Sequence, residues 1–426
     1  MNNIETKCLH AGYEDAESTT KSHAAPLYRT TSYRFNSTEH ANNLFTLKEL
    51  GNIYTRLMNP TTDILEQRIA ALEGGAAALG LASGTSAAFY SIINLAKKGD
   101  EIVSANNLYG GTYTQFNDIL PSMGIKVNFV DPVNPENFKA AINEKTKAVY
   151  CEIVGNPLLD LIDLKAIADI AHENGLPLIV DATFSTPALC RPIEHGADIV
   201  VHSLTKWLGG HGAIIGGIVV DSGKFDWTTG KHPLLSDPEP SYWNTSFAND
   251  LGDLAPLAYI LRMRLIPLRN LGACISPDNS WQALQGIETL SLRMERHSSN
   301  GLAVAKHLEN HSKIEWVRHP SLKGDSSYEL AQKYMPNGSG GMVVFGIKGG
   351  TEAGRKFIEN LNLFSHLANV GDARSLAIHP ASTTHSQLSE EQQKRVKITP
   401  DLVRLSVGLE HINDILSDID QALDSI

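Results

Sequence analysis

The sequence has few cysteines, and they form no arrangement typical of a metal site or a disulfide framework. The four cysteines are scattered, with no CxxC pair, at Cys8, Cys151, Cys190 and Cys274. At 426 residues the chain is long enough to bury a large apolar core without covalent staples. This usage argues against zinc and iron–sulfur sites and favours a reducing compartment, so we expect a cytoplasmic protein.

Long apolar runs, a basic excess and nucleotide-binding motifs are also lacking. No stretch approaches the roughly 18 apolar residues of a membrane span, and the N-terminus shows no export signal. The net charge is −11 without a basic stripe, which disfavours nucleic acid as a partner. Neither GxGxxG nor GxxxxGK[ST] occurs, which disfavours a dinucleotide or P-loop site. We therefore expect neither a membrane protein nor a nucleic-acid binder, and favour small-molecule chemistry.

What is present is an alternation of amphipathic helical segments with short apolar runs. The runs lie at 100–105, 126–131, 146–152, 176–182, 197–203 and 214–221. This pattern predicts an α/β fold with a mostly parallel sheet covered by helices on both faces. A long helical connection at 277–311 then precedes further strands at 338–350 and 401–410. We predict a dependent N-terminal arm at 1–60, a large domain at 61–275 and a smaller α/β domain at 276–426.

Lys206 is the strongest chemical candidate. In VVHSLTKWLGGHG an apolar strand ends in Ser203, Thr205 and Lys206, followed by glycines. Ligands of open parallel sheets sit at the carboxyl ends of strands, so Lys206 is placed to reach one. A lysine beside hydroxyls and glycines suits a Schiff-base lysine with a cofactor phosphate nearby. A solvated loop lysine is the alternative for this string taken alone.

Two further strings place polar groups at strand ends. Asp181 ends the apolar run of PLIVDATFSTP, where a carboxylate can hold a pyridine nitrogen protonated or cap a turn. Ser83, Gly84 and Thr85 open a helix after a short strand in LGLASGTSAAFY, where free N–H groups bind phosphate. An ordinary N-cap is the alternative for that second string.

Several aromatic and basic residues complete the candidate set. Tyr109 in NLYGGT can lie flat on a pyridine ring, and Tyr54 with Arg56 in NIYTRLMNPTT can clamp a phosphate. Arg404 lies within an apolar strand, where a substrate carboxylate or a structural salt bridge would compensate its charge. The histidines, among them His202, His211, His379 and His385, show no metal spacing, and we interpret them as satisfied structural groups.

Taken together, YTRLMNPT, SGT, LYGGT, GNP, VDATFSTP, HSLTKWLGGH and VRLSVGLE resemble the Cys/Met-metabolism family of fold-type-I enzymes that use pyridoxal 5'-phosphate (PLP). The resemblance covers nearly the whole chain and implies a seven-stranded, mostly parallel sheet. It also implies that Lys206 carries PLP as a Schiff base, Asp181 pairs with the ring nitrogen, Tyr109 stacks on the ring, and Asn156 lies near the phenolic oxygen.

The resemblance implies further roles at the phosphate and at the substrate. Gly84, Thr85, Ser203 and Thr205, with Ser83, would hold the phosphate. Tyr54 and Arg56 would reach the phosphate of a neighbouring subunit, with Tyr54 also near the substrate, which implies a homodimer and, by the family, a homotetramer. Arg404 would bind the substrate's α-carboxylate with Asn369 nearby.

Two segments resemble the O-acetylhomoserine sulfhydrylase branch of that family: LANVGDARSLAIHPASTTHSQL and QGIETLSLRMERH. Gly111 stands where methionine γ-lyases typically carry cysteine, and Arg374 where cystathionine enzymes usually carry glutamate. The resemblance therefore implies a γ-replacement in methionine biosynthesis that makes homocysteine from O-acetylhomoserine, with Lys206 as general base. Methionine or cystathionine γ-lyase, cystathionine γ-synthase and a non-catalytic PLP-binding protein are the alternatives. The acyl group stays open, as does the sulfur donor: sulfide, methanethiol or the thiocarboxylate of a small carrier protein.

Overall fold

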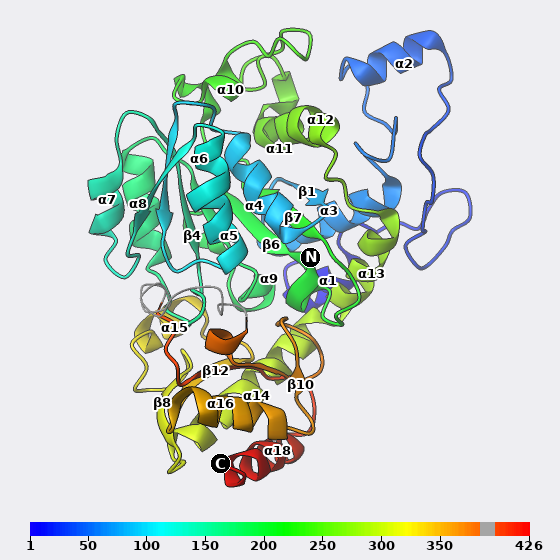
Figure 1. Cartoon of the computed structure of the whole chain (residues 1–426). Helices are drawn as coiled ribbons and strands as arrows, with labels where there is room; N and C mark the ends of the chain where they lie inside the picture. The colour runs from blue at the N-terminus through cyan, green and yellow to red at the C-terminus, as the bar shows by residue number, and fades with distance from the viewer. Residues whose placement is uncertain (384–396) are drawn as a thin grey trace.

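The computed structural model describes residues 1–383 and 397–426, and in that part of the chain two helix-covered sheets lie one above the other (Figure 1). Among those residues the larger sheet has seven strands in the order β1-β7-β6-β5-β4-β2-β3. Its strands are β1 (Ala77–Leu81), β2 (Glu101–Ala105), β3 (Lys126–Val130), β4 (Thr146–Glu152), β5 (Leu178–Asp181), β6 (Ile199–Ser203) and β7 (Gly217–Asp221).

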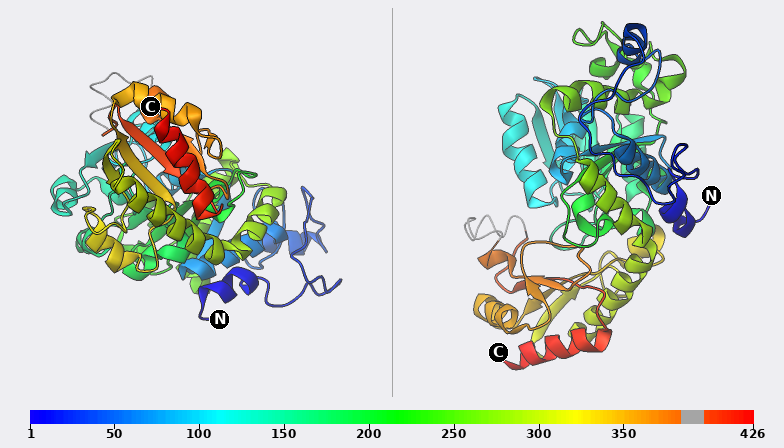
Figure 2. Two further views of the ribbon diagram at one scale, coloured as in Figure 1. Left: turned by 90° about the horizontal axis from the view of Figure 1, so that it is seen from below. Right: turned by 90° about the vertical axis from the view of Figure 1, so that its right-hand side faces the viewer.

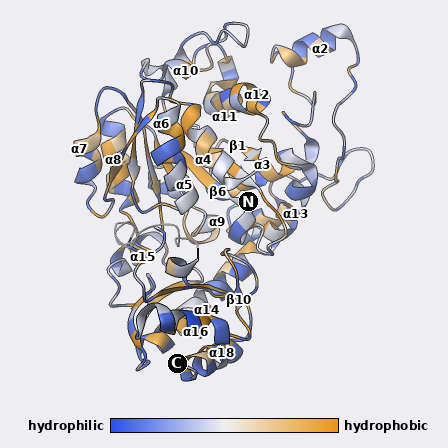
Figure 3. Ribbon diagram, viewed as in Figure 1, coloured by the Kyte–Doolittle hydropathy of each residue, from blue (hydrophilic) through white to orange (hydrophobic). Residues whose placement is uncertain are grey.

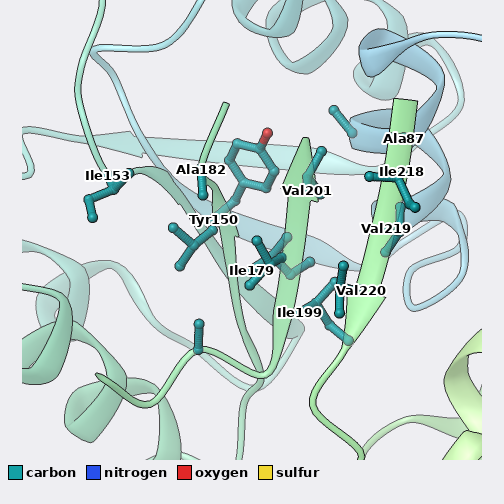
Figure 4. Close-up of a cluster of buried hydrophobic side chains, with 14 of the residues drawn as sticks. Ala87, Tyr150, Ile153, Ile179, Ala182, Ile199, Val201, Ile218, Val219 and Val220 are labelled. Carbon is teal, nitrogen blue, oxygen red and sulfur yellow. The ribbon is translucent and has the colours of Figure 1, made fainter. Parts of the chain in front are cut away.

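The large sheet is parallel except at β7, which runs antiparallel to both β1 and β6. The six apolar runs expected to be strands all form strands, and the mostly parallel α/β fold is confirmed. Strands β2 and β7 are buried at every position, and β4 at every position except Lys147, because helices cover both faces; this explains their mostly apolar sequences. Figure 4 shows this interior, with the Tyr150 ring among branched aliphatic side chains of β5 to β7.

Helices on the two faces of the large sheet begin and end at recognisable signals. The longest of them, α3, starts with the Asn59 side chain accepting from Thr61 N and stops at Gly74 in the left-handed conformation. Figure 3 shows apolar sides turned to the sheet and polar sides turned outward. The helices from here to residue 275 are α3 (Pro60–Glu73), α4 (Gly84–Ile93), α5 (Gly110–Thr114), α6 (Leu120–Ser122), α7 (Glu136–Ala141), α8 (Leu164–Glu173), α9 (Thr186–Leu189), α10 (Pro233–Ser236), α11 (Ala258–Met263) and α12 (Arg269–Leu271).

The smaller sheet has five strands in the described residues, in the order β10-β11-β12-β9-β8. Two consecutive helices, α13 (Pro277–Glu288) and α14 (Leu290–Glu309), lead to it from the large sheet, as the long helical connection predicted. The boundary at residue 275 stays a prediction. The remaining elements are β8 (Ile314–Arg318), α15 (Tyr328–Tyr334), β9 (Met342–Ile347), α16 (Gly350–Asn360), β10 (Ser365–His366), β11 (Leu376–Ile378), β12 (Leu402–Ser406) and α18 (Ile412–Asp424).

The N-terminal arm holds two short helices that its composition did not indicate, α1 (Ile4–His10) and α2 (Thr38–Phe45). Helix α1 packs on α3, α13 and α14, where its Cys8 is fully buried. Helix α2 lies at the outer edge of the molecule in Figures 1 and 2, and Tyr242 Oη donates to Phe45 O in it at 2.7 Å. The arm therefore borrows its core from other segments, because it has few apolar residues to bury by itself.

Among residues 1–383 and 397–426, no helix is both long and apolar enough to cross a bilayer. The same residues contain no group of three or more His, Cys, Asp and Glu side chains that could hold a metal ion.

Candidate active site

The candidate site lies where β5 and β6 end side by side. Asp181 ends β5 and is paired in register with Val201 of β6, so the chain after β6 turns past it. That turn is a π-helical segment, Leu204–Leu208, in which Lys206 takes a non-helical conformation (φ −94°, ψ −137°). Parallel neighbouring strands deliver their following residues to one edge of a sheet, so Lys206 and Asp181 lie at the same edge.

Lys206 lies among polar residues from distant parts of the chain. Its Nζ donates to Oδ1 of Asn369 at 2.5 Å, and Nη1 of Arg404 donates to Oδ1 of Asn156 at 3.3 Å. Burial, followed by the charge of Arg404, lowers the pKa of Lys206 to about 8. Burial likewise lowers the pKa of Arg404 to about 10.

Neither cation has a carboxylate ion-pair partner in the described residues, so the salt bridge considered for Arg404 is not found there. Two neighbouring, partly buried cations without a carboxylate partner in the described residues make a site for an anionic ligand, since a charge withdrawn from water is costly unless it is compensated. A carboxylate is a suitable ligand for a guanidinium, because the planar guanidinium can donate two parallel hydrogen bonds to its two oxygens.

Asp181 lies in a buried acidic cluster. Its Oδ1 accepts from Thr183 N at 2.9 Å, so it caps a local turn as well as facing the site. Glu152 of β4 is its register partner, and the Tyr150 ring lies close by. Burial, and then the Asp181 charge, raise the pKa of Glu152 well above its usual range. Burial also raises the pKa of Asp181, but less strongly than that of Glu152, so Asp181 is the member of the pair that more readily stays ionised.

Tyr109 stands over this cluster and is half exposed, so its ring has an open face. Its backbone N–H donates to Oε1 of Glu152 at 2.7 Å. A side chain at Gly111 would collide with the ring, because a Cβ there would lie 2.6 Å from Cε1 of Tyr109. Sequence reasoning missed Glu152, although the glutamate at the end of TKAVYCE, on the strand beside Asp181, was a visible signal.

The strings expected to hold phosphate converge at the start of α4. Ser83 Oγ caps the helix by accepting from Ser86 N at 3.1 Å and lies 2.9 Å from Thr85 Oγ1. Gly84 lies against Ser203 so closely that a Cβ on it would be 2.6 Å from the serine Cβ. Thr205 is fixed by Gly216, whose N–H donates to Oγ1 at 3.1 Å. The N-cap that was the alternative for this string is present, and the serine and threonine hydroxyls gather at the positive end of a helix.

Tyr54 and Arg56 lie together in the arm, with the guanidinium 5.3 Å from the ring centroid. Among the described residues no hydrogen bond joins either side chain to Lys206, Asp181 or Ser203. Their expected place at a neighbouring subunit stays a prediction.

The expectation that the histidines are satisfied is wrong at three of them, because His202 Nδ1, His232 Nδ1 and His297 Nε2 have no hydrogen-bond partner in the described residues. His202 is fully buried and pairs with Glu73 at 2.6 Å between Nε2 and Oε1, but its Nδ1 has no hydrogen-bond partner in the described residues. It is therefore not fully satisfied, because the apolar sheet interior offers that nitrogen no acceptor. His211 and His379 do have partners, and His385 lies outside the described residues. Arg374 is largely exposed and pairs with Asp372 at 3.2 Å.

Comparison with known proteins decides the family. The Cys/Met metabolism PLP-dependent enzyme family matches residues 5–424. The chain belongs to this family. It is 55% identical to an O-acetyl-L-homoserine sulfhydrylase of Leptospira meyeri, with 99% of this chain and 97% of that protein covered. It is also 51% identical to O-acetyl-L-homoserine sulfhydrylase 1 of Thermus thermophilus, with 99% of both covered.

Homocysteine synthase of Schizosaccharomyces pombe is 50% identical to the chain, with 99% of this chain and 98% of that protein covered. A Campylobacter jejuni structure assigned as an O-acetylhomoserine (thiol)-lyase superposes with a TM-score of 0.95 at 39% identity. That superposition covers 99% of this chain and all of the other, which contains N'-pyridoxyl-lysine-5'-monophosphate.

PLP is thus the cofactor of this family member, and the residues present fit it. Lys206 has a buried amine with a lowered pKa, as attack on an aldehyde requires. Asp181 supplies a partly buried carboxylate for a ring nitrogen, and Tyr109 leaves a ring face open. Gly84 and its hydroxyl neighbours form an anion-binding cradle that a Cβ would close.

Proposed function

We propose that this chain converts O-acetyl-L-homoserine and sulfide into L-homocysteine and acetate, a γ-replacement in methionine biosynthesis. In this reaction the Cγ–O bond breaks, acetate leaves with the bonding electrons, and a C–S bond forms at the same carbon. The observation that carries the proposal is the pair of partly buried cations, Lys206 and Arg404, which bond Asn369 and Asn156 and have no carboxylate partner in residues 1–383 or 397–426. The sulfhydrylase and homocysteine-synthase names of several close relatives specify the branch.

Each candidate side chain takes a role that its surroundings support. Arg404 binds the substrate's α-carboxylate, and Asn369 and Asn156 line the same space, with Asn156 also near the cofactor's phenolic oxygen. Bound PLP supplies an electron sink that lets the proton on Cα leave. Lys206, released from the cofactor by the substrate amine, takes that proton, and its lowered pKa makes it an effective base near neutral pH.

Other residues hold the cofactor in this proposal. Asp181 stabilises the positive charge of the ring nitrogen, while Tyr109 covers the ring. Ser83, Gly84, Thr85, Ser203 and Thr205 bind the phosphate. Tyr54 and Arg56 complete the phosphate site of a neighbouring subunit, which makes the enzyme a homodimer at least and, as a dimer of dimers, a homotetramer. The half-exposed Tyr109 and the extended arm support this assembly.

The proposal places the enzyme in the cytoplasm, in line with four unpaired cysteines. Sulfide is the proposed donor, with methanethiol or the thiocarboxylate of a small sulfur-carrier protein as variants of the same replacement. Each would present a sulfur nucleophile to Cγ.

Product analysis of the PLP-loaded protein tests the proposal. O-acetyl-L-homoserine should give homocysteine and acetate when sulfide is present, and Lys206→Ala should lose both turnover and the visible absorbance of bound PLP. Parallel reactions with O-succinyl-L-homoserine, cysteine and L-methionine separate the alternatives. Formation of 2-oxobutyrate from methionine would identify a γ-lyase, and acceptance of cysteine alone would identify a cystathionine γ-synthase.

A further inference from the structure

Helix α14 carries a buried arginine that has no part in the proposed chemistry. Arg293 is 5% exposed, and no carboxylate pairs with it in residues 1–383 or 397–426. Its guanidinium instead donates to three backbone carbonyls: Trp207 O at 2.7 Å, Gly286 O at 2.6 Å and Leu208 O at 3.4 Å. Burying a cation is costly, and here the hydrogen bonds to these carbonyls offset that cost. The planar guanidinium also holds the carbonyls at fixed positions.

The backbone that the Arg293 guanidinium holds is the turn at Leu204–Leu208, which carries Lys206. Trp207 and Leu208 follow Lys206 directly and end the π-helical segment, where carbonyls have lost their internal partners. Lys206 itself is in a non-helical conformation, and its own carbonyl accepts from Gly210 N at 2.7 Å. Arg293 therefore supplies the hydrogen bonds that hold this irregular backbone in one geometry.

Glycines of neighbouring segments pack closely against the turn that carries Lys206. A Cβ on Gly286 of α13 would lie 2.3 Å from Gly209 O, and one on Gly210 would lie 2.2 Å from Nη1 of Arg293. On another side, a Cβ on Gly371 would lie 2.7 Å from the backbone nitrogen of Trp207. The lysine turn is thus enclosed by α13, by α14 and by the segment that carries Asn369.

The same helix also holds the chain that follows β12. His297 Nδ1 donates to Val407 O at 2.7 Å, and Asn300 Nδ2 donates to Gly408 O at 2.9 Å. Residues 293, 297 and 300 follow the spacing of one helix face. Helix α14 therefore contacts both the Lys206 turn and the end of the strand that carries Arg404.

We infer that Arg293 is a positioning residue for Lys206, and that α14 sets the separation between the Lys206 amine and the Arg404 guanidinium. This inference rests on the proposed role of Lys206. Its consequence is that the amine keeps the alignment needed to move a proton at the substrate's Cα. A misplacement of about 1 Å costs on the order of 100-fold in rate in well-oriented reactions.

The test compares Arg293→Lys with Arg262→Lys in the PLP-loaded enzyme. Arg262 is equally buried, at 3% exposure, but bonds Asn94 and Glu239, away from the lysine turn. Arg293→Lys should lower kcat roughly tenfold or more with little change in KM for O-acetylhomoserine. It should also shift the pH midpoint of the cofactor's visible absorbance and weaken PLP binding. Arg262→Lys should lower the melting temperature while leaving that midpoint unchanged.

Gly286→Ala provides a second route, because its new Cβ presses on the same turn from α13 and should shift the midpoint in the same assay. If Arg293→Lys and Gly286→Ala only lower the melting temperature, with native kcat and native midpoint, the inference is wrong. Should Arg293→Lys fail to fold, Gly286→Ala decides by the same two readings. If the native enzyme binds PLP through Lys206 but makes no homocysteine, the proposed reaction is wrong. The pH midpoint of the cofactor's visible absorbance in these variants would still test whether Arg293 positions Lys206.

Discussion

The rate at which the cofactor-free chain captures PLP should rise with pH through a midpoint near 8. The amine of Lys206 must be unprotonated to attack the cofactor's aldehyde. Burial, and then the charge of Arg404, lower the pKa of Lys206 from 10.5 to about 8, because both disfavour the ammonium form. At pH 7 about one molecule in ten then has a free amine, against about one in three thousand for an ordinary lysine.

Arg404→Leu is the informative perturbation, because it removes the like charge beside the amine. The pKa of Lys206 should then rise and move the midpoint of capture to higher pH. Since burial is the larger cause, the midpoint should stay below 10.5. Arg355→Leu, on the exposed side of α16, is the matched control and should leave the midpoint in place.

The assay is rapid mixing of the cofactor-free protein with PLP, followed by visible absorbance from mildly acidic to strongly alkaline pH. The same titration with Nα-acetyl-lysine corrects for the protonation of PLP itself. A native midpoint at the ordinary lysine value would refute the reasoning. A fall in the midpoint with Arg404→Leu would show that the sign of the charge interaction is wrong.

Three further outcomes are expected. Arg404→Leu removes the partner of the substrate's α-carboxylate and should raise KM for O-acetylhomoserine by about 30-fold or more in steady-state assays, since losing a charge pair withdrawn from water costs roughly 2–5 kcal/mol. PLP should stay bound in this variant. Glu152→Gln should bind PLP nearly as tightly as the native chain, because burial raises the pKa of Glu152 toward the neutral form and Gln keeps an oxygen that accepts from Tyr109 N. Glu152→Ala should weaken PLP binding about fivefold through the lost bond to Tyr109; equal dissociation constants for the two variants would contradict this. Gly84→Ala should weaken PLP binding by about tenfold or more in equilibrium titrations, because its Cβ would separate α4 from Ser203 in an overpacked contact, whereas Gly324→Ala, which meets open space, should not.

The strands of the large sheet and the places of two proposed site residues could be predicted from sequence. Continuous apolar runs between amphipathic helices predict buried parallel strands, since both faces of such a sheet are covered. Asp181 and Lys206 each follow such a run, and parallel strands deliver their ends to one edge, so their proximity follows from local pattern. Helix α1 of the N-terminal arm was not predictable in this way, because its apolar face is completed by contacts with the distant helices α3, α13 and α14.

Only the tertiary structure decided which side chains meet at the site. Arg404 reaches Asn156 across 248 residues of chain, and Lys206 reaches Asn369 across 163, through the packing of the smaller sheet under the larger one. No local pattern encodes such distances, because they depend on strand order and on helices α13 and α14. The burial of the Arg293 guanidinium could not be predicted from sequence either. A lone arginine in an amphipathic helix predicts a solvent-exposed side chain, and only the structure shows the backbone carbonyls that it bonds. Sequence determined which chemistry the chain can carry, while the fold decided where each charge is buried and therefore what it binds.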